Sequence, residues 1–300
     1  MGIKGNFYKF LSANAGGGIS RVVITQERFP SIAVDLPIYL NKYKAIYGSA
    51  WREHFGRFLD FFVNREIALW CVFDGKSPIE KRSECERRQK NRARNYETVQ
   101  LTEAALKEYT QSGVANPHLI ELNKRFIPSF LTHEEICVSQ ITRYIDKMKS
   151  HMYKLEPDDY EWAANAIAIR GLTALTALEE AEKMCARLCK NGTCTAAMSD
   201  DSDLFAYMCP TIITKIDVSS ATCQVIDMTR VLDDLCLSRE QFLDLCIMCG
   251  TDYNNNCPGI ATIRAYQYIT KYTSIENFAR ETNTDVTVLN YSRVRQLFTI

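Results

Sequence analysis

The sequence predicts an α/β fold, a mostly parallel sheet flanked by helices, from two observations. Two apolar runs, Ser31–Val34 and Glu66–Phe73, have the composition of buried strands and enclose a helical pattern at Trp51–Asn64. This β-α-β order predicts parallel strands joined by a right-handed crossover. An acid follows each run, Asp35 after the first and Asp74 after the second. Because the carboxyl ends of parallel strands share one edge of a sheet, we expect these acids to lie close together.

Composition is that of a soluble globular protein. The 300 residues are 46% hydrophobic and 24% charged. No apolar run is long enough to span a membrane, and the opening residues lack the apolar core of a signal peptide. Twelve cysteines without such a signal predict free thiols in a reducing, intracellular compartment. Cys246 and Cys249 stand at C-x-x-C spacing inside a helical pattern, which favours buried thiols over a zinc site.

Two further pairs of acids stand next to predicted elements. Glu180 and Glu182 fall in the first turn of a helix predicted at 179–190, which Gly192 ends, and Asp201 and Asp203 follow a short strand predicted at 193–198. A solvated acidic loop is the alternative reading of one such pair. Carboxylates held side by side repel one another unless cations lie between them. The repeated placement of acids after apolar runs therefore predicts one shared cation site.

A basic segment follows Asp74. Residues 76–94 hold eight basic and three acidic residues, although the net charge of the whole chain is zero. One interpretation is an exposed helix with i,i+4 ion pairs such as Glu84–Arg88. The excess of positive charge favours a helix that faces phosphates, and a basic strip beside an acidic pocket is what a metal-dependent nuclease needs.

The remaining patterns are mostly helical. Residues 95–155 are predicted to form helices with breaks at Gly113–Pro117 and Pro128–His133, as an insertion between two strands of the sheet. A tight loop with Asp252 and Gly259 joins two helices, and the N–H groups at the start of the second can bind phosphate, although many structural turns look alike. The other predicted elements are a helix at 160–170, a weak strand at 172–175, two strands that meet at 219–220, and helices at 239–249 and 262–270.

Six short motifs occur in one order along the chain: MGIKG at 1–5, AVD at 33–35, VFDG at 72–75, EEAEKMC at 179–185, SDDSD at 199–203 and GTDY at 250–253. Together they resemble the flap endonuclease and xeroderma group G family of structure-specific 5′ nucleases, through nearly the whole chain to RQLF at 295–298. The compact chain resembles the form found in large DNA viruses. The resemblance implies a PIN-like sheet with an inserted helical arch and a helix–two-turn–helix element. It also implies four parts: 1–75, 76–155 (arch and cap), 156–238 and 239–300 (DNA-binding).

The resemblance also implies a site. Two Mg²⁺ ions, for which Mn²⁺ can substitute, are expected on seven acids: Asp35, Asp74, Glu180, Glu182, Asp201, Asp203 and Asp252. Lys81 and Arg88 match the basic pair that grips the scissile phosphate, so with Asp201 they are the expected catalytic residues. Potassium is expected at Asn256, Cys257 and Ile260, although the hairpin has GIAT where the family has G-I-G. The expected DNA contacts are Gly2, Tyr39 (with Tyr43 as the alternative), Arg82, Arg87, Gly259, Ile260 and Arg264.

The implied activity is metal-dependent hydrolysis of phosphodiesters at 5′ flaps and junctions and from 5′ ends of DNA, in replication, repair or recombination. The expected partner is branched or flapped double-stranded DNA, in a nucleus or a viral cytoplasmic replication site, with no membrane and no tail for docking to a sliding clamp. The arch is longer than in cellular flap endonucleases. Two alternatives stay open: a 5′-to-3′ exonuclease mainly on RNA or single strands, and a non-catalytic DNA-junction binder.

Overall fold

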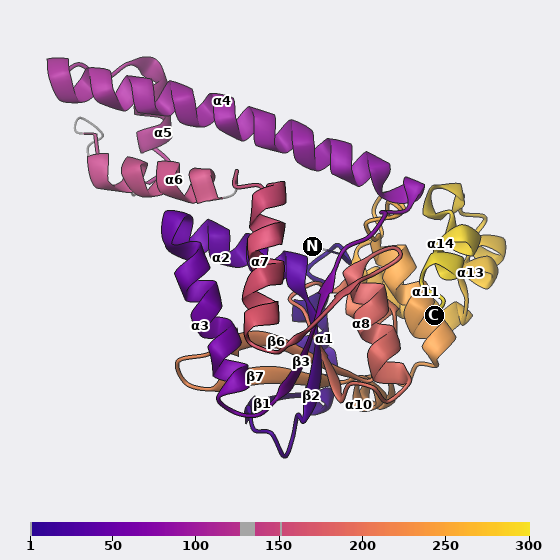
Figure 1. Cartoon of the computed structure of the whole chain (residues 1–300). Helices are drawn as coiled ribbons and strands as arrows, with labels where there is room; N and C mark the ends of the chain where they lie inside the picture. Colours follow the sequence, from indigo (N-terminus) through magenta and orange to yellow (C-terminus); the bar gives the residue numbers. More distant parts are fainter. Residues whose placement is uncertain (1, 127–135, 151) are drawn as a thin grey trace. The chain divides into compact units, whose positions relative to one another are not determined.

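The computed structural model describes residues 2–126, 136–150 and 152–300. These form two compact units. The first comprises Met1–Leu40, Glu53–Arg82 and Pro157–Ile300, and the second comprises Asn41–Arg52 and Ser83–Glu156. The first contains the sheet and the second is helical (Figure 1).

The first unit is built on a seven-stranded sheet within the described residues, with strand order β1-β7-β6-β5-β2-β3-β4. Strands β2 to β6 pair in parallel, while β1 and β7 add an antiparallel edge, which confirms the predicted mostly parallel sheet. The strands are β1 (Ile19–Val23), β2 (Ser31–Asp35), β3 (Ala68–Phe73), β4 (Thr173–Thr176), β5 (Ala196–Met198), β6 (Thr211–Asp217) and β7 (Thr222–Asp227).

The register of the central strands places their carboxyl ends at one edge. Asp35, the last residue of β2, pairs with Val72 of β3, and Val34 pairs with Met198 of β5. Asp74 and Ser199 therefore follow directly at the same edge. The core of β2 and β5 is fully buried, with Val34 and Met198 both at 0% exposure. The acids thus extend from a rigid, close-packed base.

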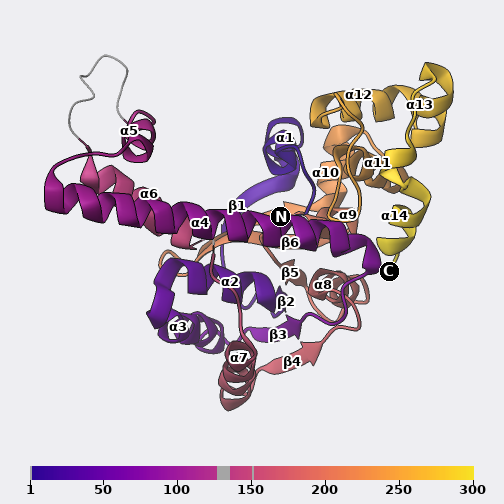
Figure 2. The same cartoon turned by 90° about the horizontal axis from the view of Figure 1, so that it is seen from above.

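Helices cover the sheet. α8 packs on β2, β3 and β5, α7 packs on β4, and Figure 2 shows α7 and α8 on opposite sides of the sheet. The helices of this unit are α1 (Phe7–Asn14), α7 (Pro157–Ile169), α8 (Ala181–Lys190), α9 (Asp203–Ala206), α10 (Met228–Leu235), α11 (Arg239–Cys249), α12 (Thr262–Tyr272), α13 (Ile275–Thr282) and α14 (Tyr291–Leu297), with α2 (Leu36–Tyr47) and α3 (Trp51–Val63) shared between the units.

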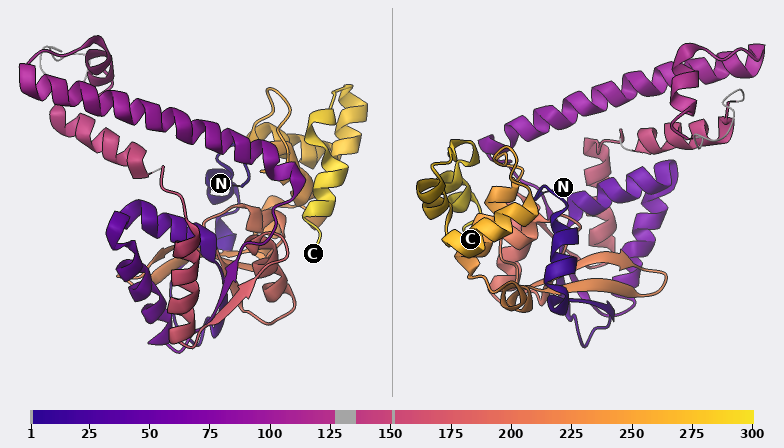
Figure 3. Two further views of the ribbon diagram at one scale, coloured as in Figure 1. Left: turned by 45° about the horizontal axis from the view of Figure 1, so that its top comes forward. Right: turned by 180° about the vertical axis from the view of Figure 1, so that it is seen from behind.

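The C-terminal helices form a compact group with α11, as the orange and yellow ribbons of Figure 3 show. α11 begins with a capping box in which Ser238 accepts from the Gln241 N–H and the Gln241 side chain accepts from the Ser238 N–H. Arg295 of α14 holds the buried Asp244 of α11 at 2.7 Å. This group fixes the end of α11, where Asp252 follows.

The second unit has its own small core. The 31-residue α4 (Arg82–Ser112) is followed by α5 (Pro117–Asn123) and α6 (Val138–Ser150), and Val99, Leu119 and Ile141 are among the buried residues they share. The predicted break at Gly113–Pro117 is confirmed, because the Asn116 side chain caps α5 and Pro117 opens it. The predicted break at Pro128–His133 lies outside the described residues.

No helix in the described part of the chain combines the length and the apolar character that crossing a membrane requires.

Candidate active site

The seven predicted acids lie at or next to the ends of strands and helices of the first unit. Asp35 ends β2, Asp74 follows β3, and Glu180 and Glu182 flank the start of α8. Asp201 lies between β5 and α9, Asp203 begins α9, and Asp252 follows α11. Asp74 Oδ1 accepts from the N–H of Ala181 at 2.9 Å, so this carboxylate caps the N-terminus of α8. The structure thus joins the β3 end to the helix that carries the glutamate pair.

Six of these seven carboxylates are buried. Burial, with the neighbouring charges of Asp74 and Asp201, raises the pKa of Asp35 to about 8. Burial also raises the pKa of Glu182 well above its ordinary value, and the charges of Asp35 and Asp201 add to that rise. The pKa of Asp203 is raised in the same way, by burial first and then by Asp201 and Asp252. The seven acids therefore form one electrostatically connected cluster, of which Asp74 is the exposed member.

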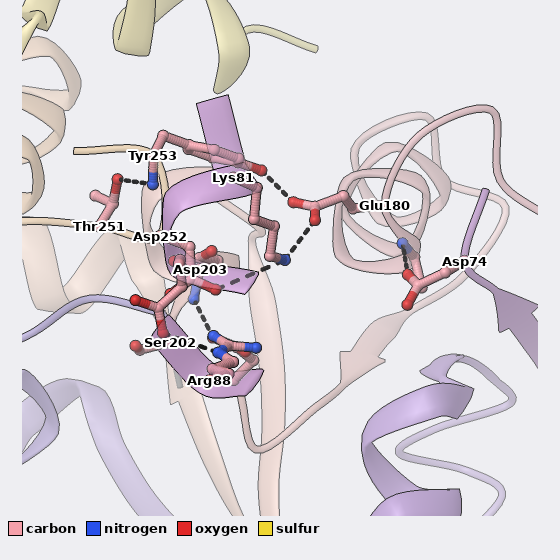
Figure 4. A network of polar contacts seen from close by, with 12 residues as sticks. Asp74, Lys81, Arg88, Glu180, Ser202, Asp203, Thr251, Asp252 and Tyr253 are labelled. Carbon is pink, nitrogen blue, oxygen red and sulfur yellow. Dashed lines mark hydrogen bonds and ion pairs between the residues drawn. The ribbon is translucent and has the colours of Figure 1, made fainter. Parts of the chain in front are cut away.

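Lys81 places an ammonium group inside this cluster. Its ammonium group contacts Glu180 Oε1 and lies 3.6 Å from Asp252 Oδ2, with the side chain 12% exposed. Burial alone would lower the pKa of Lys81, but the charges of Glu180 and Glu182 outweigh it and hold the pKa above its ordinary value. Figure 4 shows Lys81 reaching between Glu180 and Asp252, with Asp74 on the far side of Glu180.

Two tyrosines also contact Glu180, one directly and one through the other. The Tyr253 hydroxyl donates to Glu180 Oε2, and Tyr207 Oη lies 3.1 Å from Tyr253 Oη. A local turn positions Tyr253, because its N–H donates to Thr251 Oγ1 at 3.1 Å. Sequence reasoning missed Tyr253, although it stands next to Asp252 in GTDY.

The two serines of the motif SDDSD also hold the cluster in place. Ser199 Oγ donates to Asp35 Oδ2 at 2.6 Å and accepts from the Asp201 N–H at 2.9 Å. Ser202 Oγ accepts from the Ile3 N–H at 2.7 Å and so ties the first residues of the chain to the acids. These serines, too, were missed as functional residues.

Gly2 is buried directly against the aspartates. Its φ is +80°, and a methyl group added there would lie 2.1 Å from Asp201 Oδ1 and 2.7 Å from Asp203 Oδ1. Only glycine fits this contact without displacing a carboxylate. The contact with DNA predicted for Gly2 stays a prediction.

Gly2→Ala should therefore destabilise the protein by about 1–3 kcal/mol, the usual cost of overpacking a buried site. Chemical denaturation of the variant measures this cost. The matched control is Gly16→Ala, since a methyl group on Gly16 meets no atom within 4 Å among the described residues. Equal stability of the Gly2→Ala variant and the wild type would contradict this contact.

The donor set fits a hard divalent cation. All seven side chains offer carboxylate oxygens, which Mg²⁺ prefers. Asp203 Oδ1 is buried without a hydrogen-bond donor among the residues that the structure describes. Within the same residues, no three acid, histidine or cysteine side chains already converge closely enough to enclose an ion. The ligand chemistry is thus present, and Lys81 provides the positive charge in this arrangement.

The raised pKa values predict how pH affects the metal-free protein. Because the pKa of Asp35 rises from 3.8 to about 8, the folded state binds more protons than the unfolded state between these two pH values. The free energy of unfolding should therefore decrease as pH rises through this window. We expect the melting temperature in EDTA to be lower near pH 8 than near pH 6, and Mg²⁺ to raise it more at the higher pH. Asp35→Asn should flatten the pH dependence, and an unchanged slope in that variant would contradict the assignment.

The predicted basic residues lie on and next to α4. Arg82 is exposed at the start of the helix. Arg87 and Arg88 both bind Glu84, at 2.6 Å and 2.8 Å, and these guanidinium groups lower the pKa of Glu84 to about 2. The predicted i,i+4 pair between Glu84 and Arg88 is present, so the helix has internal ion pairs as well as excess positive charge.

Tyr39 requires a correction. Its side chain is fully buried and stacks on Phe58, with 5.4 Å between ring centroids. This packing leaves no ring face for a nucleobase, so the predicted DNA contact of Tyr39 is wrong. Tyr39 lies in the first turn of α2, where the neighbouring Leu36 and Leu40 are also buried. Tyr43, the alternative, is half-buried.

The loop before α12 carries the remaining predicted contacts. Arg264 Nη1 donates to the Gly259 carbonyl at 2.8 Å, and a cavity of about 690 Å³ beside these residues also includes Lys9 of α1. The Asn256 side-chain amide donates to the Ile260 carbonyl at 2.9 Å and to the Cys257 carbonyl at 3.3 Å. A potassium ion would compete with this amide for the same oxygens. Potassium binding here stays a prediction.

Comparisons with known proteins show which family the chain belongs to. Residues 171–252 match the XPG I-region family model. A putative RAD2-like endonuclease of Frog virus 3 is 31% identical over 92% of this chain and 77% of its own length. A probable RAD2-like endonuclease of Invertebrate iridescent virus 3 is 26% identical over 100% of this chain and 86% of its own length.

Solved structures show the same fold. The catalytic core of Rad2 in complex with a DNA substrate matches 91% of this chain and 71% of its own, with a TM-score of 0.64 and 19% identity. Flap endonuclease-1 from Methanococcus jannaschii matches 95% of this chain and 83% of its own, with a TM-score of 0.57 and 20% identity. With the extent of the match to the Frog virus 3 relative, these findings show that the chain belongs to the XPG and flap endonuclease (RAD2-like) family of nucleases.

Proposed function

We propose that this protein is a Mg²⁺-dependent nuclease that hydrolyses phosphodiesters at 5′ flaps and junctions of DNA. The observation that carries the proposal is the cluster of seven carboxylates, six of them buried, at the ends of β2, β3 and β5 and at the neighbouring ends of α8 and α11. Such a cluster is costly without cations, and natural proteins retain it where the cost serves a function.

The residues fall into two groups by position. Asp35, Asp74, Glu180 and Glu182 would hold one ion, and Asp201, Asp203 and Asp252 would hold the second. A bound pair of Mg²⁺ ions supplies an activated water and stabilises the leaving 3′ oxygen of the cut strand. Mn²⁺ offers the same preference for oxygen ligands.

The other side chains position this cluster. Tyr253 and Ser199 donate hydrogen bonds to Glu180 and Asp35, which fixes the orientation of both carboxylates. Lys81 places a positive charge in the site, where it can neutralise charge that develops on the phosphoryl oxygens. The phosphate contact that the sequence predicts for Arg88 stays a prediction.

DNA binding is proposed at two surfaces. Exposed arginines of α4 and its start, Arg82 among them, offer contacts to phosphates that do not depend on base sequence. The start of α12, with Arg264 and Lys9 beside it, offers backbone N–H groups and positive charge to the duplex backbone. The Rad2 core, which shares this fold, was solved with a DNA substrate.

A comparison of substrates tests the proposal. The protein is first treated with EDTA and then given Mg²⁺. It is incubated separately with three end-labelled substrates: DNA with a 5′ flap, nicked DNA and single-stranded RNA. A single product released at the flap junction supports the proposal. A ladder of mononucleotides from 5′ ends, or preference for RNA, would favour the exonuclease alternative. Tight junction binding with no cleavage in Mg²⁺ or Mn²⁺ would favour a non-catalytic binder and overturn the proposal.

A further inference from the structure

A second concavity opens beside the acid cluster, at the free edge of the sheet. It has a volume of about 290 Å³ and lies between the β4–α8 loop and the first turns of α8. Its lining includes Thr176, Leu178, Glu180, Lys183, Met184 and Arg187. Glu180 therefore belongs both to this concavity, which we call the edge pocket, and to the acid cluster.

The loop that forms one wall of the edge pocket is rigidly held. The Gly75 N–H donates to the Glu179 carbonyl at 2.6 Å, and the Lys76 N–H donates to the Leu178 carbonyl at 3.2 Å. A methyl group on Gly75 would lie 2.1 Å from the Ala177 carbonyl oxygen, so the two segments are in close contact. The loop holds the Leu178 side chain out of the core, 87% exposed.

The pocket offers an apolar surface. Met184 of α8 is half-buried against the core, and its flexible, polarisable thioether is of the kind that packs on flat rings. Leu178 adds an apolar side chain beside it. A single exposed leucine is ordinary on a protein surface. A leucine fixed by a rigid loop, next to a methionine and an active-site glutamate, forms a small binding surface.

The charges around the pocket leave one cation uncompensated. Lys183 Nζ binds Glu179 at 2.7 Å, and Glu180 is bound by Lys81 and Tyr253. Arg187 lies one turn beyond Lys183 on the same face of α8 and is exposed. Among the described residues, its guanidinium has no ion-pair or hydrogen-bond partner. An apolar wall beside one free guanidinium matches a nucleotide, which joins a flat base to a phosphate.

We propose that the edge pocket binds the nucleotide adjoining the scissile phosphate, with its base against Leu178 and Met184 and its outer phosphate on Arg187. This inference rests on the proposed nuclease function and adds a positioning surface to it. Glu180 belongs both to the acid cluster and to the edge pocket. A strand whose scissile phosphate lies at the acids therefore brings its adjoining nucleotide to the pocket, and this nucleotide is the proposed occupant. The volume of about 290 Å³ suits one base rather than a longer segment.

The first test measures single-turnover cleavage of flap DNA that carries a normal or an abasic nucleotide on either side of the scissile phosphate. In the wild type, the abasic site on one side should slow cleavage by about tenfold, as expected for the loss of one base contact. In the double variant Leu178→Ala/Met184→Ala, the abasic and normal substrates should be cut at rates within about twofold of each other. An abasic effect of the same size in both proteins would overturn the proposal. Ile169→Ala, which changes a side chain that is 84% exposed elsewhere, is the matched control.

The second test concerns Arg187. Arg187→Gln should raise KM about tenfold with kcat unchanged, and should reduce the slope of log KM against log salt by about one. The control is Arg230→Gln, an arginine whose side chain is 70% exposed on α10. Equal KM and salt slope in Arg187→Gln and the wild type would overturn the phosphate contact.

A binding measurement separates this inference from the proposed function. A flap DNA with 2-aminopurine at the adjoining nucleotide is bound in EDTA, where no cleavage occurs. A fluorescence change that disappears in Leu178→Ala/Met184→Ala supports the pocket even if the wild type cuts nothing, in which case only the nuclease function fails. The same fluorescence change in the wild type and in the double variant would overturn the proposed pocket. Free deoxynucleoside monophosphate can also be added as an inhibitor of cleavage. If Arg187→Gln abolishes this inhibition while an abasic site in the flap DNA has no effect on the wild type, the pocket binds free nucleotides. That result would overturn the assignment to a nucleotide of the bound strand.

Discussion

Asp201→Ala is expected to reduce Mg²⁺-dependent cleavage of a labelled 5′-flap DNA by about 10³-fold or more, the size expected when a group acting directly on transition-state charge is removed. Asp201 is 7% exposed, and its Oδ1 accepts from the Asp203 N–H at 3.1 Å. Its loss therefore removes one carboxylate and the acceptor of the Asp203 backbone N–H. Single-turnover rates with saturating enzyme measure the effect.

The same change should raise the stability of the metal-free protein. The pKa of Asp201 is raised, chiefly by burial, so the charged carboxylate is unfavourable in the folded state. Alanine removes that cost, and Mg²⁺ should stabilise the variant less than the wild type. A higher melting temperature in EDTA together with lost cleavage distinguishes a missing ligand from misfolding.

Asp200→Ala is the matched control. Asp200 is the neighbouring aspartate, but it binds Thr214 Oγ1 at 2.8 Å and the Lys215 N–H at 2.9 Å. It stabilises the second half of β6 and belongs to none of the proposed ligand groups. Its variant should cleave within about twofold of the wild type, the range of surface changes away from a site. Equal cleavage by Asp201→Ala and wild type would refute the proposed role of Asp201.

Lys81→Met should have the second large effect, with the opposite sign for stability. Methionine keeps the length of the side chain but leaves Glu180 and Asp252 without their ammonium partner. Breaking a buried ion pair on one side costs about 3–5 kcal/mol, so the metal-free protein should be less stable. Cleavage should fall by about 10²-fold, because the Lys81 ammonium group then no longer neutralises charge on the phosphoryl oxygens.

Mg²⁺ distinguishes this account from a general packing defect. In Lys81→Met, divalent ions no longer compete with the ammonium group, so Mg²⁺ should restore more stability than it adds to the wild type. Thermal melts with and without Mg²⁺ measure the difference. Lys76→Met, at an exposed position five residues earlier, should change neither stability nor cleavage. A Lys81→Met variant with wild-type stability in EDTA would show that Lys81 does not balance the acids.

The parallel centre of the sheet could be predicted because its signals are local. The apolar runs that became β2 and β3 each end in an acid, and β-strand register then places both acids at one edge. β5 is shorter than the predicted 193–198, since the Cys194 N–H donates to the Leu188 carbonyl of α8 instead of joining the sheet. β1 was missed because its pairing partner, β7, lies about two hundred residues away and its residues alternate only weakly.

The site was predicted less completely than the fold. Motif order located the acids, but the Lys81–Glu180 contact joins residues 99 positions apart, and the Tyr253–Glu180 contact joins residues 73 apart. No periodicity encodes such pairs. Tyr39 was misjudged because a tyrosine near an acid motif has the same local sequence whether it faces solvent or, as here, stacks on Phe58.

Anomalous scattering from a crystal soaked in Mn²⁺ tests the central claim most directly, namely that seven distant acids form one divalent-cation site. Two manganese peaks, each bounded by carboxylate oxygens of the two proposed groups and with Lys81 withdrawn from Glu180, are the predicted result. Manganese bound elsewhere, or no peak beside acids that keep their contacts with Lys81, would contradict it.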